Sequence, residues 1–198
     1  MIKHLFDTLA AALAIISMCP FLALCALLIK QEDKGSIFYR GERIGLNGKL
    51  FRIYKFRTMV MDAEKFGASS TSEDDARITK IGSFLRKYKL DEIPQLINVL
   101  KGEMSIVGPR PQVSWAVELY SAEEKRLLTV RPGITDYASI RFRNESDILK
   151  GSADPDRDYL EKIAPEKLRL ALKYIDTMSL WTDLKIIFGT LKVLFKNE

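Results

Sequence analysis

The sequence predicts an α+β fold that is mostly helical and membrane-associated, with a small β-hairpin and an N-terminal membrane helix broken by a proline. Three observations predict it. Residues 8–29 carry no charge, residues 36–57 hold two aromatic and β-branched stretches around an Asn-Gly pair, and the second half repeats apolar residues at helical spacing. A chain of 198 residues is long enough to bury a core of its own.

Charge and composition narrow the classes of partner. The chain has 31 Lys and Arg against 26 Asp and Glu, a net charge of +5, which favours an anionic partner such as acidic lipid, nucleic acid or a phosphorylated substrate. Two cysteines and one histidine exclude a disulfide scaffold and a Cys/His zinc site. We expect no nucleic acid partner, because the basic residues gather at Gly/Pro turns and no zinc-finger or RNP-like pattern is present.

The N-terminal segment is the right length for a membrane. The uncharged run has 22 residues, and a bilayer core needs about 20 apolar residues as a helix. It is too long for the apolar part of a signal peptide and no small-residue cleavage site follows it. A buried core helix is the alternative interpretation.

Pro20 stands inside this run, where a proline bends or breaks a helix. A kinked span would place Met1 on the far side of the bilayer, whereas a re-entrant helix would enter and leave through one face. The physical argument leaves both topologies open. We expect residues 1–34 to form the membrane helix and residues 35–198 to form a separate domain.

Residues 36–57 predict a hairpin that turns at residues 45–49. These glycines and Lys49 do not form a phosphate-binding loop, because the G-x-x-x-x-G-K-[ST] spacing is absent. Helices are then predicted at residues 73–89, with Ser72 as the cap, and at residues 94–100. A strand is expected at 105–107 and a rigid extended loop at 108–111, since each proline restricts its own backbone and that of the residue before it.

The remaining elements are mainly helical. We predict a helix over 112–128, a strand or irregular segment over 134–143, and helices over 156–161 and 165–177. Residues 180–195 are apolar with interspersed lysines. They could form an amphipathic helix on anionic lipid or a helix packed against the core.

The adjacent acids Asp91 and Glu92 are the strongest candidates for chemistry. Two acids before a helix are also what the helix dipole favours, which is the purely structural interpretation. Their surroundings are rich in arginine, however, often beside Gly or Pro. Carboxylates among arginines suit a diphosphate bound with Mg²⁺, and a carboxylate can attack phosphorus to form an acyl phosphate.

Three motifs resemble one known family. The run LDEIPQLINVLKGEMSIVGPRP at residues 90–111, YKFRTM at 54–59 and VRPGIT at 130–135 are similar to the signature blocks of the bacterial sugar transferases, which are small monotopic phosphoglycosyl transferases. The proline-containing apolar helix fits as well, so the resemblance covers nearly the whole chain.

The resemblance implies a reaction and its components. The family transfers a sugar-1-phosphate from a UDP-sugar to a polyprenol phosphate such as undecaprenyl phosphate, with Mg²⁺ as cofactor, and so begins glycan assembly. By this resemblance Asp91 is the nucleophile and a metal ligand, and Glu92 orients the metal or deprotonates the acceptor. The residues expected to bind substrate are Lys55, Arg57, Arg86, Pro109, Arg110, Pro111, Arg131 and Arg143.

The resemblance also implies a re-entrant helix in the bacterial inner membrane, with the catalytic domain on the cytoplasmic face. It leaves open the identity of the sugar and whether the protein forms a homodimer. Asp136, Arg141 and Phe142 replace smaller or neutral residues of many members, in a region expected to contact the sugar or nucleotide. The competing function is a membrane-anchored module that binds anionic lipid without chemistry.

Overall fold

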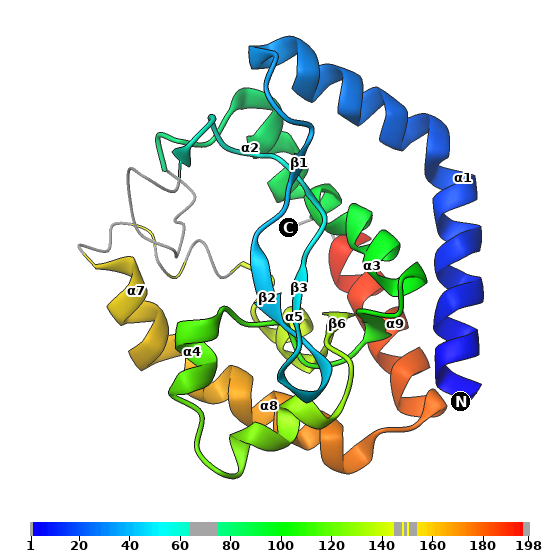
Figure 1. The fold of residues 1–198 in the computed structure, drawn as a ribbon, viewed down its shortest axis with the longest axis vertical. Helices are drawn as coiled ribbons and strands as arrows, with labels where there is room; N and C mark the ends of the chain where they lie inside the picture. Colours follow the sequence, from blue (N-terminus) through cyan, green and yellow to red (C-terminus); the bar gives the residue numbers. More distant parts are fainter. Residues whose placement is uncertain (1, 64–74, 145–147, 149, 151–153, 196–198) are drawn as a thin grey trace.

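A computed structural model describes residues 2–63, 75–144, 148, 150 and 154–195. The α+β prediction is confirmed: helices dominate, and the strands form three two-stranded sheets. Figure 1 shows the long N-terminal helix α1 along one side of the molecule, with the other elements gathered against it.

The first half of the chain is built on α1 and a hairpin. Its elements are α1 (Ile2–Asp33), β1 (Phe38–Tyr39), β2 (Glu42–Ile44), the 3-10 turn η1 (Leu46–Gly48), β3 (Leu50–Arg52), β4 (Lys55–Phe56), α2 (Lys80–Lys87), the 3-10 helix η3 (Leu90–Gln95) and α3 (Leu96–Leu100). In the second half lie β5 (Ser105–Val107), α4 (Ser114–Glu118), the 3-10 helix η4 (Glu124–Thr129), β6 (Gly133–Thr135), α5 (Tyr137–Arg141), α7 (Pro155–Asp158), the π-helical turn η5 (Tyr159–Ile163), α8 (Ala164–Thr177) and α9 (Leu180–Phe195).

α1 bends and stays a helix. Pro20 lies inside its 32 residues, and Figure 1 shows the ribbon turning near its middle. The half before the bend contributes Ala11 to a core with Phe51 and Val99, and the half after it contributes Ile29 to a second core with Leu85. Among the described residues, α1 is the one helix whose length and apolar composition would let it cross a membrane, and only a small part of it is buried.

The hairpin prediction is confirmed. β1 pairs antiparallel with β4, and β2 with β3, through the turn that contains Asn47 and Gly48. Both of these residues have positive φ, at 55° and 75°, a conformation that asparagine and glycine tolerate best. The predicted strand at 105–107 is also present as β5, which pairs in parallel with β6.

Several helix boundaries were predicted wrongly. The helix expected from residue 73 begins only at Lys80, where the Thr79 hydroxyl accepts from the Gly82 amide as the cap. Before it, Asp75 accepts from the Arg77 amide and Ile78 bridges to Met59, so this backbone is held in other bonds. The Ser72 cap lies outside the described residues.

The helix predicted at 112–128 is two short helices, α4 and η4. A capping box divides them: the Ser121 amide donates to the Glu124 carboxylate and the Glu124 amide to the Ser121 hydroxyl. The predicted 94–100 helix starts earlier, as a 3-10 helix from Leu90 that includes Pro94. Segment 134–143 is a strand only to Thr135 and then forms helix α5.

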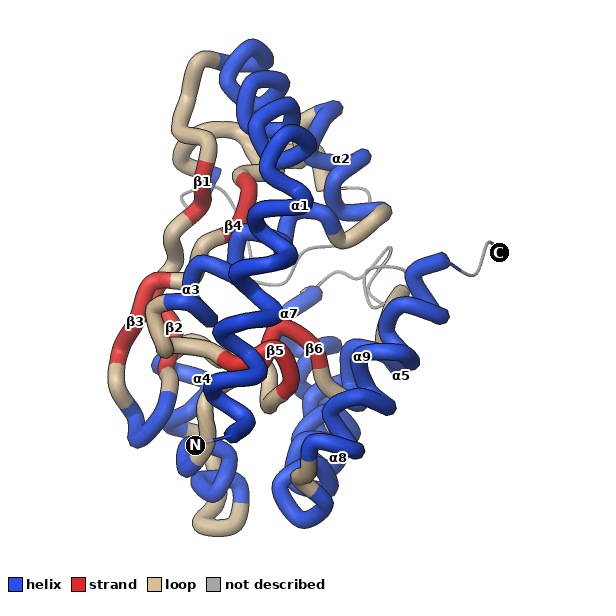
Figure 2. Tube along the Cα trace, turned by 90° about the vertical axis from the view of Figure 1, so that its right-hand side faces the viewer, coloured by secondary structure: helices blue, strands red, loops and turns tan. Residues whose placement is uncertain are grey.

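The last helices lie where the sequence places them. The helix expected at 156–161 begins at Pro155 and passes into the π turn η5, and α8 and α9 follow. α9 buries Ile186 with Val107 and Tyr174, which confirms core packing for this face, while Trp181 and Phe188 on the same helix are exposed. Figure 2 shows α8 and α9 on one side of β5 and β6, with β2 and β3 on the other.

Candidate active site

The 3-10 helix η3 presents the two adjacent acids. Lys89 adopts a left-handed backbone conformation, φ 55°, which turns the chain out of α2 and into η3. Asp91 is buried at 8% exposure, and the Glu92 side chain is 15% exposed. η3 packs against β4 and α2, so side chains from three separate elements surround the acids.

Glu92 is held by two cations. Lys55 Nζ on β4 lies 2.7 Å from its Oε1, and the guanidinium of Arg110 contacts both carboxylate oxygens, with Nη1 donating to Oε2 at 3.1 Å. Burial acts to raise the pKa of Glu92, but Arg110 and Lys55 outweigh it and hold that pKa well below its usual value. Glu92 therefore stays ionised and is a weak base.

Asp91 has different surroundings. Within the described part of the chain, no hydrogen bond or ion pair holds its carboxylate, although Lys55, Arg86 and Lys89 lie near enough to lower its pKa. Burial and the charge of Glu92 outweigh these cations and raise the pKa of Asp91 above its usual value. A buried carboxylate without a partner, surrounded by cations, is suited to meet a ligand that brings its own positive or electrophilic centre.

The loop that carries Arg110 is fixed by a close backbone crossing. The Gly108 amide donates to the Thr135 carbonyl at 3.0 Å, and the Gly133 amide to the Pro109 carbonyl at 2.9 Å. A Cβ on Gly133 would lie 2.0 Å from the Gly108 nitrogen, so only glycine fits there. This crossing places Arg110 against Glu92.

A cavity of about 420 Å³ opens beside Glu92 and Arg110. Pro109 and Arg143, two of the residues expected to bind substrate, line it, and Arg143 also donates to the Val193 carbonyl of α9. Most of the remaining lining is apolar and comes from α4, α5, η5, α8 and α9. Glu92 therefore reaches this largely apolar cavity, whereas Asp91 is not among its lining residues.

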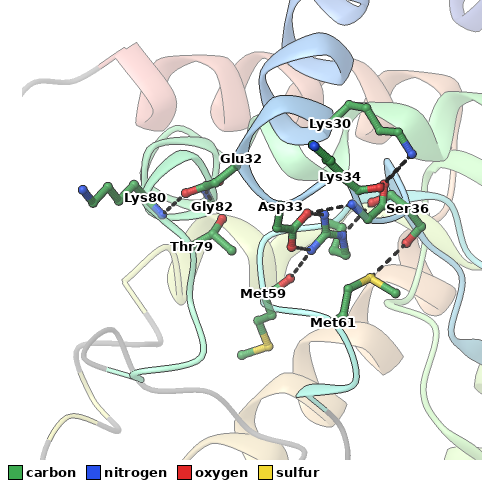
Figure 3. A network of polar contacts seen from close by, with 12 residues as sticks. Lys30, Glu32, Asp33, Lys34, Ser36, Met59, Met61, Thr79, Lys80 and Gly82 are labelled. Atoms are coloured by element: carbon green, nitrogen blue, oxygen red, sulfur yellow. Dashed lines mark hydrogen bonds and ion pairs between the residues drawn. The ribbon is translucent and has the colours of Figure 1, made fainter.

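Three predicted residues have other partners. Arg57 donates to the Ser36 carbonyl at 2.6 Å and pairs with Asp33, which fastens the end of α1 to the hairpin (Figure 3). Arg131 donates to the Gly102 carbonyl at 2.8 Å, and Pro111 is buried beside the backbone bond between Ile44 and Gln112. Arg86 belongs to the site through its effect on Asp91, and it donates to the Thr58 hydroxyl at 2.9 Å.

The structure adds Lys89 and Lys167 to the site, and Asp136 comes from the region expected to contact the sugar or nucleotide. Lys89 and Lys167 line the cavity together with Asp136, which is 2% exposed and accepts from both the amide and the hydroxyl of Ser139. The position of Lys89, two residues before Asp91, is a signal that could have found it. No local pattern marks Lys167, because it comes from α8, distant in the sequence.

A divalent cation would find few ligands here. No group of three or more His, Cys, Asp or Glu side chains gathers anywhere in the described ranges. Mg²⁺ is commonly held by one or two carboxylates together with substrate phosphates, and the Asp91 carboxylate, which is bonded to none of the described side chains, fits that pattern. Glu92, already paired with Lys55 and Arg110, is a poorer candidate.

Comparison with known proteins identifies the family. The sequence model described as bacterial sugar transferase matches residues 1–197. The chain is 39% identical over 204 residues to the exopolysaccharide production protein ExoY of Sinorhizobium fredii, covering 96% of this chain and 83% of the relative.

Two longer relatives match over part of their length. The UDP-glucose:undecaprenyl-phosphate glucose-1-phosphate transferase of Escherichia coli is 38% identical over 207 residues, 100% of this chain and 41% of the relative. The UDP-N-acetylgalactosamine-undecaprenyl-phosphate N-acetylgalactosaminephosphotransferase of Aeromonas hydrophila is 36% identical over 196 residues, 98% of this chain and 43% of the relative. With a match across almost its entire length, the chain belongs to the bacterial sugar transferase family.

Proposed function

We propose that this protein transfers a sugar-1-phosphate from a UDP-sugar to undecaprenyl phosphate, and that Asp91 is the nucleophile. The observation that carries this proposal is the buried Asp91 carboxylate, which lies near Lys55, Arg86 and Lys89 and has no hydrogen bond or ion pair with any residue that the structure describes. The names of the relatives support the two substrates. The differing sugars in those names leave the sugar of this protein open.

The reaction proceeds in two balanced steps. An oxygen of Asp91 attacks the phosphorus that bears the sugar, the bond from that phosphorus to the bridging oxygen breaks, and UMP leaves with the electron pair. A phosphate oxygen of undecaprenyl phosphate then attacks the same phosphorus and releases the Asp91 carboxylate. Mg²⁺, when bound, neutralises charge on the diphosphate, and Asp91 is the residue that would hold it.

Glu92 acts by holding cations in place. Because its pKa is lowered, it does not readily take a proton from the acceptor. Its two partners, Lys55 and Arg110, are instead kept beside the reacting phosphates, where fixed positive charge stabilises the transition state. The geometry thus favours a positioning role for Glu92 over that of a general base.

We further propose that α1 is re-entrant and that the catalytic body lies on the cytoplasmic face of the inner membrane. Both ends of α1 are tied to the same body, through Lys3 to Asp183 of α9 at one end and through Asp33 to Arg57 at the other. A helix that crossed the bilayer fully would separate these ends by the membrane. The bend around Pro20 allows both ends to lie on one side.

The test uses detergent-solubilised protein with Mg²⁺, undecaprenyl phosphate and a panel of UDP-sugars, and measures UMP. We expect Asp91→Asn to lower UMP release more than about a thousandfold. With the donor alone, the intact mass of the wild-type protein should increase by one phosphosugar, and that of Asp91→Asn should not. UMP release at the wild-type rate by Asp91→Asn would overturn the proposal and leave a lipid-binding module as the better account.

A further inference from the structure

A second group of buried polar side chains lies where the start of α1 meets α8, α9 and β5. This N-terminal polar cluster consists of Lys3, Asp7, Ser105, Tyr174 and Asp183. Four of its members are almost fully buried, with Asp7 3% exposed and Ser105, Tyr174 and Asp183 1% exposed each. None of the five belongs to the set that surrounds Asp91 and Glu92, so the proposed chemistry does not account for them.

The cluster is joined by short contacts. Lys3 Nζ donates to Asp183 Oδ2 at 2.6 Å, the Tyr174 hydroxyl lies 2.7 Å from Asp183 Oδ1, and the Ser105 hydroxyl lies 2.6 Å from Asp7 Oδ2. Buried polar groups that lose a partner cost the full free energy of desolvation. The cluster therefore holds four elements in one arrangement.

Two hydroxyls of the cluster converge on one backbone atom. The Val107 carbonyl oxygen lies 2.9 Å from the Ser105 hydroxyl and 3.2 Å from the Tyr174 hydroxyl. Val107 ends β5, and the next residues are the Gly108–Arg110 segment, whose guanidinium contacts Glu92. The cluster thus fixes the backbone three residues before the cation that holds Glu92.

We propose that Tyr174 and Asp183 are positioning residues for Arg110, and that Lys3 and Asp7 make this positioning depend on the seating of α1. The proposal rests on the proposed transfer reaction. The single proton of the Tyr174 hydroxyl is shared between Asp183 Oδ1 and the Val107 carbonyl, and this three-centre contact fixes the direction in which the loop projects Arg110. Because Lys3 and Asp7 belong to α1, a helix that is not seated leaves Asp183 and Ser105 without these partners.

A double-mutant cycle tests the positioning. Tyr174→Phe removes the hydroxyl and keeps the ring, and it is compared with Arg110→Ala and with the double variant. We expect Tyr174→Phe to lower kcat/KM for the UDP-sugar about fivefold to tenfold in the wild-type background and to cause no further loss when Arg110 is absent. If the fold-loss of kcat/KM in the double variant equals the product of the two single losses, the proposal is overturned, because Tyr174 would then act independently of Arg110.

The control removes a comparable hydroxyl that does not lead to the loop. Thr182 Oγ1 donates to the Thr177 carbonyl at 2.7 Å, at the turn between α8 and α9. Thr182→Val should leave kcat/KM unchanged. Lys3→Met should show a loss in the same direction as Tyr174→Phe, and an unchanged kcat/KM would refute the link to α1.

A second measurement does not depend on turnover. Amide hydrogen exchange at Gly108, whose amide bonds to the Thr135 carbonyl, should become faster in Tyr174→Phe and stay unchanged in Thr182→Val. If the wild-type protein released no UMP, the proposed transfer reaction would be refuted. Amide exchange at Gly108 would still test whether the N-terminal polar cluster fixes the loop. If Tyr174→Phe does not fold, Ser105→Ala, which removes the other hydroxyl beside the Val107 carbonyl, takes its place in both measurements.

Discussion

At the scale of single residues, the proposed chemistry starts from two adjacent carboxylates with opposite surroundings. Glu92 has Lys55 and Arg110 as partners and a lowered pKa, while Asp91 has no bonded partner among the described residues and a raised pKa. A raised pKa makes a carboxylate a stronger nucleophile once it is ionised. The cations that keep Glu92 charged thus leave Asp91 as the group that we propose to react.

This difference predicts the acid side of the pH–rate profile. Asp91 must be ionised to attack, so turnover should fall as the pH drops through the pKa of Asp91, with a midpoint above the usual aspartate value of about 3.9. Arg86→Met removes a cation that lowers this pKa, so the midpoint should move to higher pH. Lys87→Met, an exposed change on the same helix, is the control. A midpoint that Arg86→Met leaves in place would contradict the assignment.

Stability should depend on pH through Glu92. Its lowered pKa means that the ionised side chain contributes stability that is fully present above the usual glutamate value and is lost as the pH falls through the lowered one. We expect Glu92→Gln to cost about 2 kcal/mol at pH 7, because Lys55 and Arg110 lose their anion, and less near pH 4. Thermal unfolding at the two pH values measures this, with the exposed Glu123→Gln as control. An equal cost at both values would be the contrary result.

Gln95 offers a test of buried polarity. It is 1% exposed, and its Nε2 has no hydrogen-bond partner among the described residues. Asn98, on the next turn, bonds to the Tyr54 amide and the Arg52 carbonyl. Gln95→Met, similar in shape, should therefore raise the free energy of unfolding by about 1 kcal/mol, whereas Asn98→Leu should lower it. Denaturant unfolding measures these free energies. A lower free energy of unfolding in Gln95→Met would show that the Gln95 amide group makes a stabilising hydrogen bond.

The sequence predicted which charged residues of the candidate site stand together in one motif. It did not predict the pairings between residues that are distant in the sequence. Asp91, Glu92 and Arg110 stand within one continuous motif, so a pattern could place them together. Arg57 stands in a motif as well, yet its strongest partner is Asp33, 24 residues away, and no local signal gives that pairing. The bonding of a cation is set by tertiary structure even where its identity is set by a motif.

At the scale of elements, strands and turns were easier to predict than helix boundaries. The Asn47-Gly48 turn fixes its hairpin because few other residues accept that backbone. Helix starts depend on caps, and Thr79 and Ser121 compete with other candidates close by in the sequence. Apolar periodicity continues through these caps, so periodicity alone overextends the helices.

The close contact between Gly133 of β6 and Gly108, which directly follows β5, should be sensitive to a small change. A Cβ at Gly133 would lie 2.0 Å from the Gly108 nitrogen, so Gly133→Ala should displace the Arg110 loop, abolish UMP release and lower stability by about 3 kcal/mol or more. Gly48→Ala is the matched control, since its Cβ meets nothing within 4 Å. Its positive φ should cost about 1 kcal/mol with turnover unchanged. Normal UMP release by Gly133→Ala would show that the crossing can relax.

At the scale of the whole molecule, α1 is a bent helix, and both of its ends contact the rest of the protein. Near its start, Lys3 and Asp7 contact Asp183 and Ser105. Near its end, Glu32 accepts from the Lys80 amide at 2.8 Å, as Figure 3 shows, and Asp33 pairs with Arg57. Leucines and isoleucines remain exposed along the helix between these ends, including Leu9, Leu13, Ile16, Leu24 and Leu27. The exposed apolar surface of α1 therefore lies between two ends that are each bound to the rest of the protein by polar contacts.

This arrangement predicts which side of a membrane the N-terminus occupies. In a Cys19→Ser, Cys25→Ala background, a cysteine replaces Ile2, which is 73% exposed, and in a second protein it replaces the exposed Glu123 of the catalytic body. A membrane-impermeant maleimide added to sealed vesicles should label both positions from the same side, and from the cytoplasmic side in inverted vesicles. A spanning helix would expose them on opposite sides and would require the contact of Lys3 with Asp183 to break. Labelling of Ile2→Cys and Glu123→Cys from opposite sides would therefore refute the re-entrant topology and, with it, the dependence of the Arg110 loop on a seated α1.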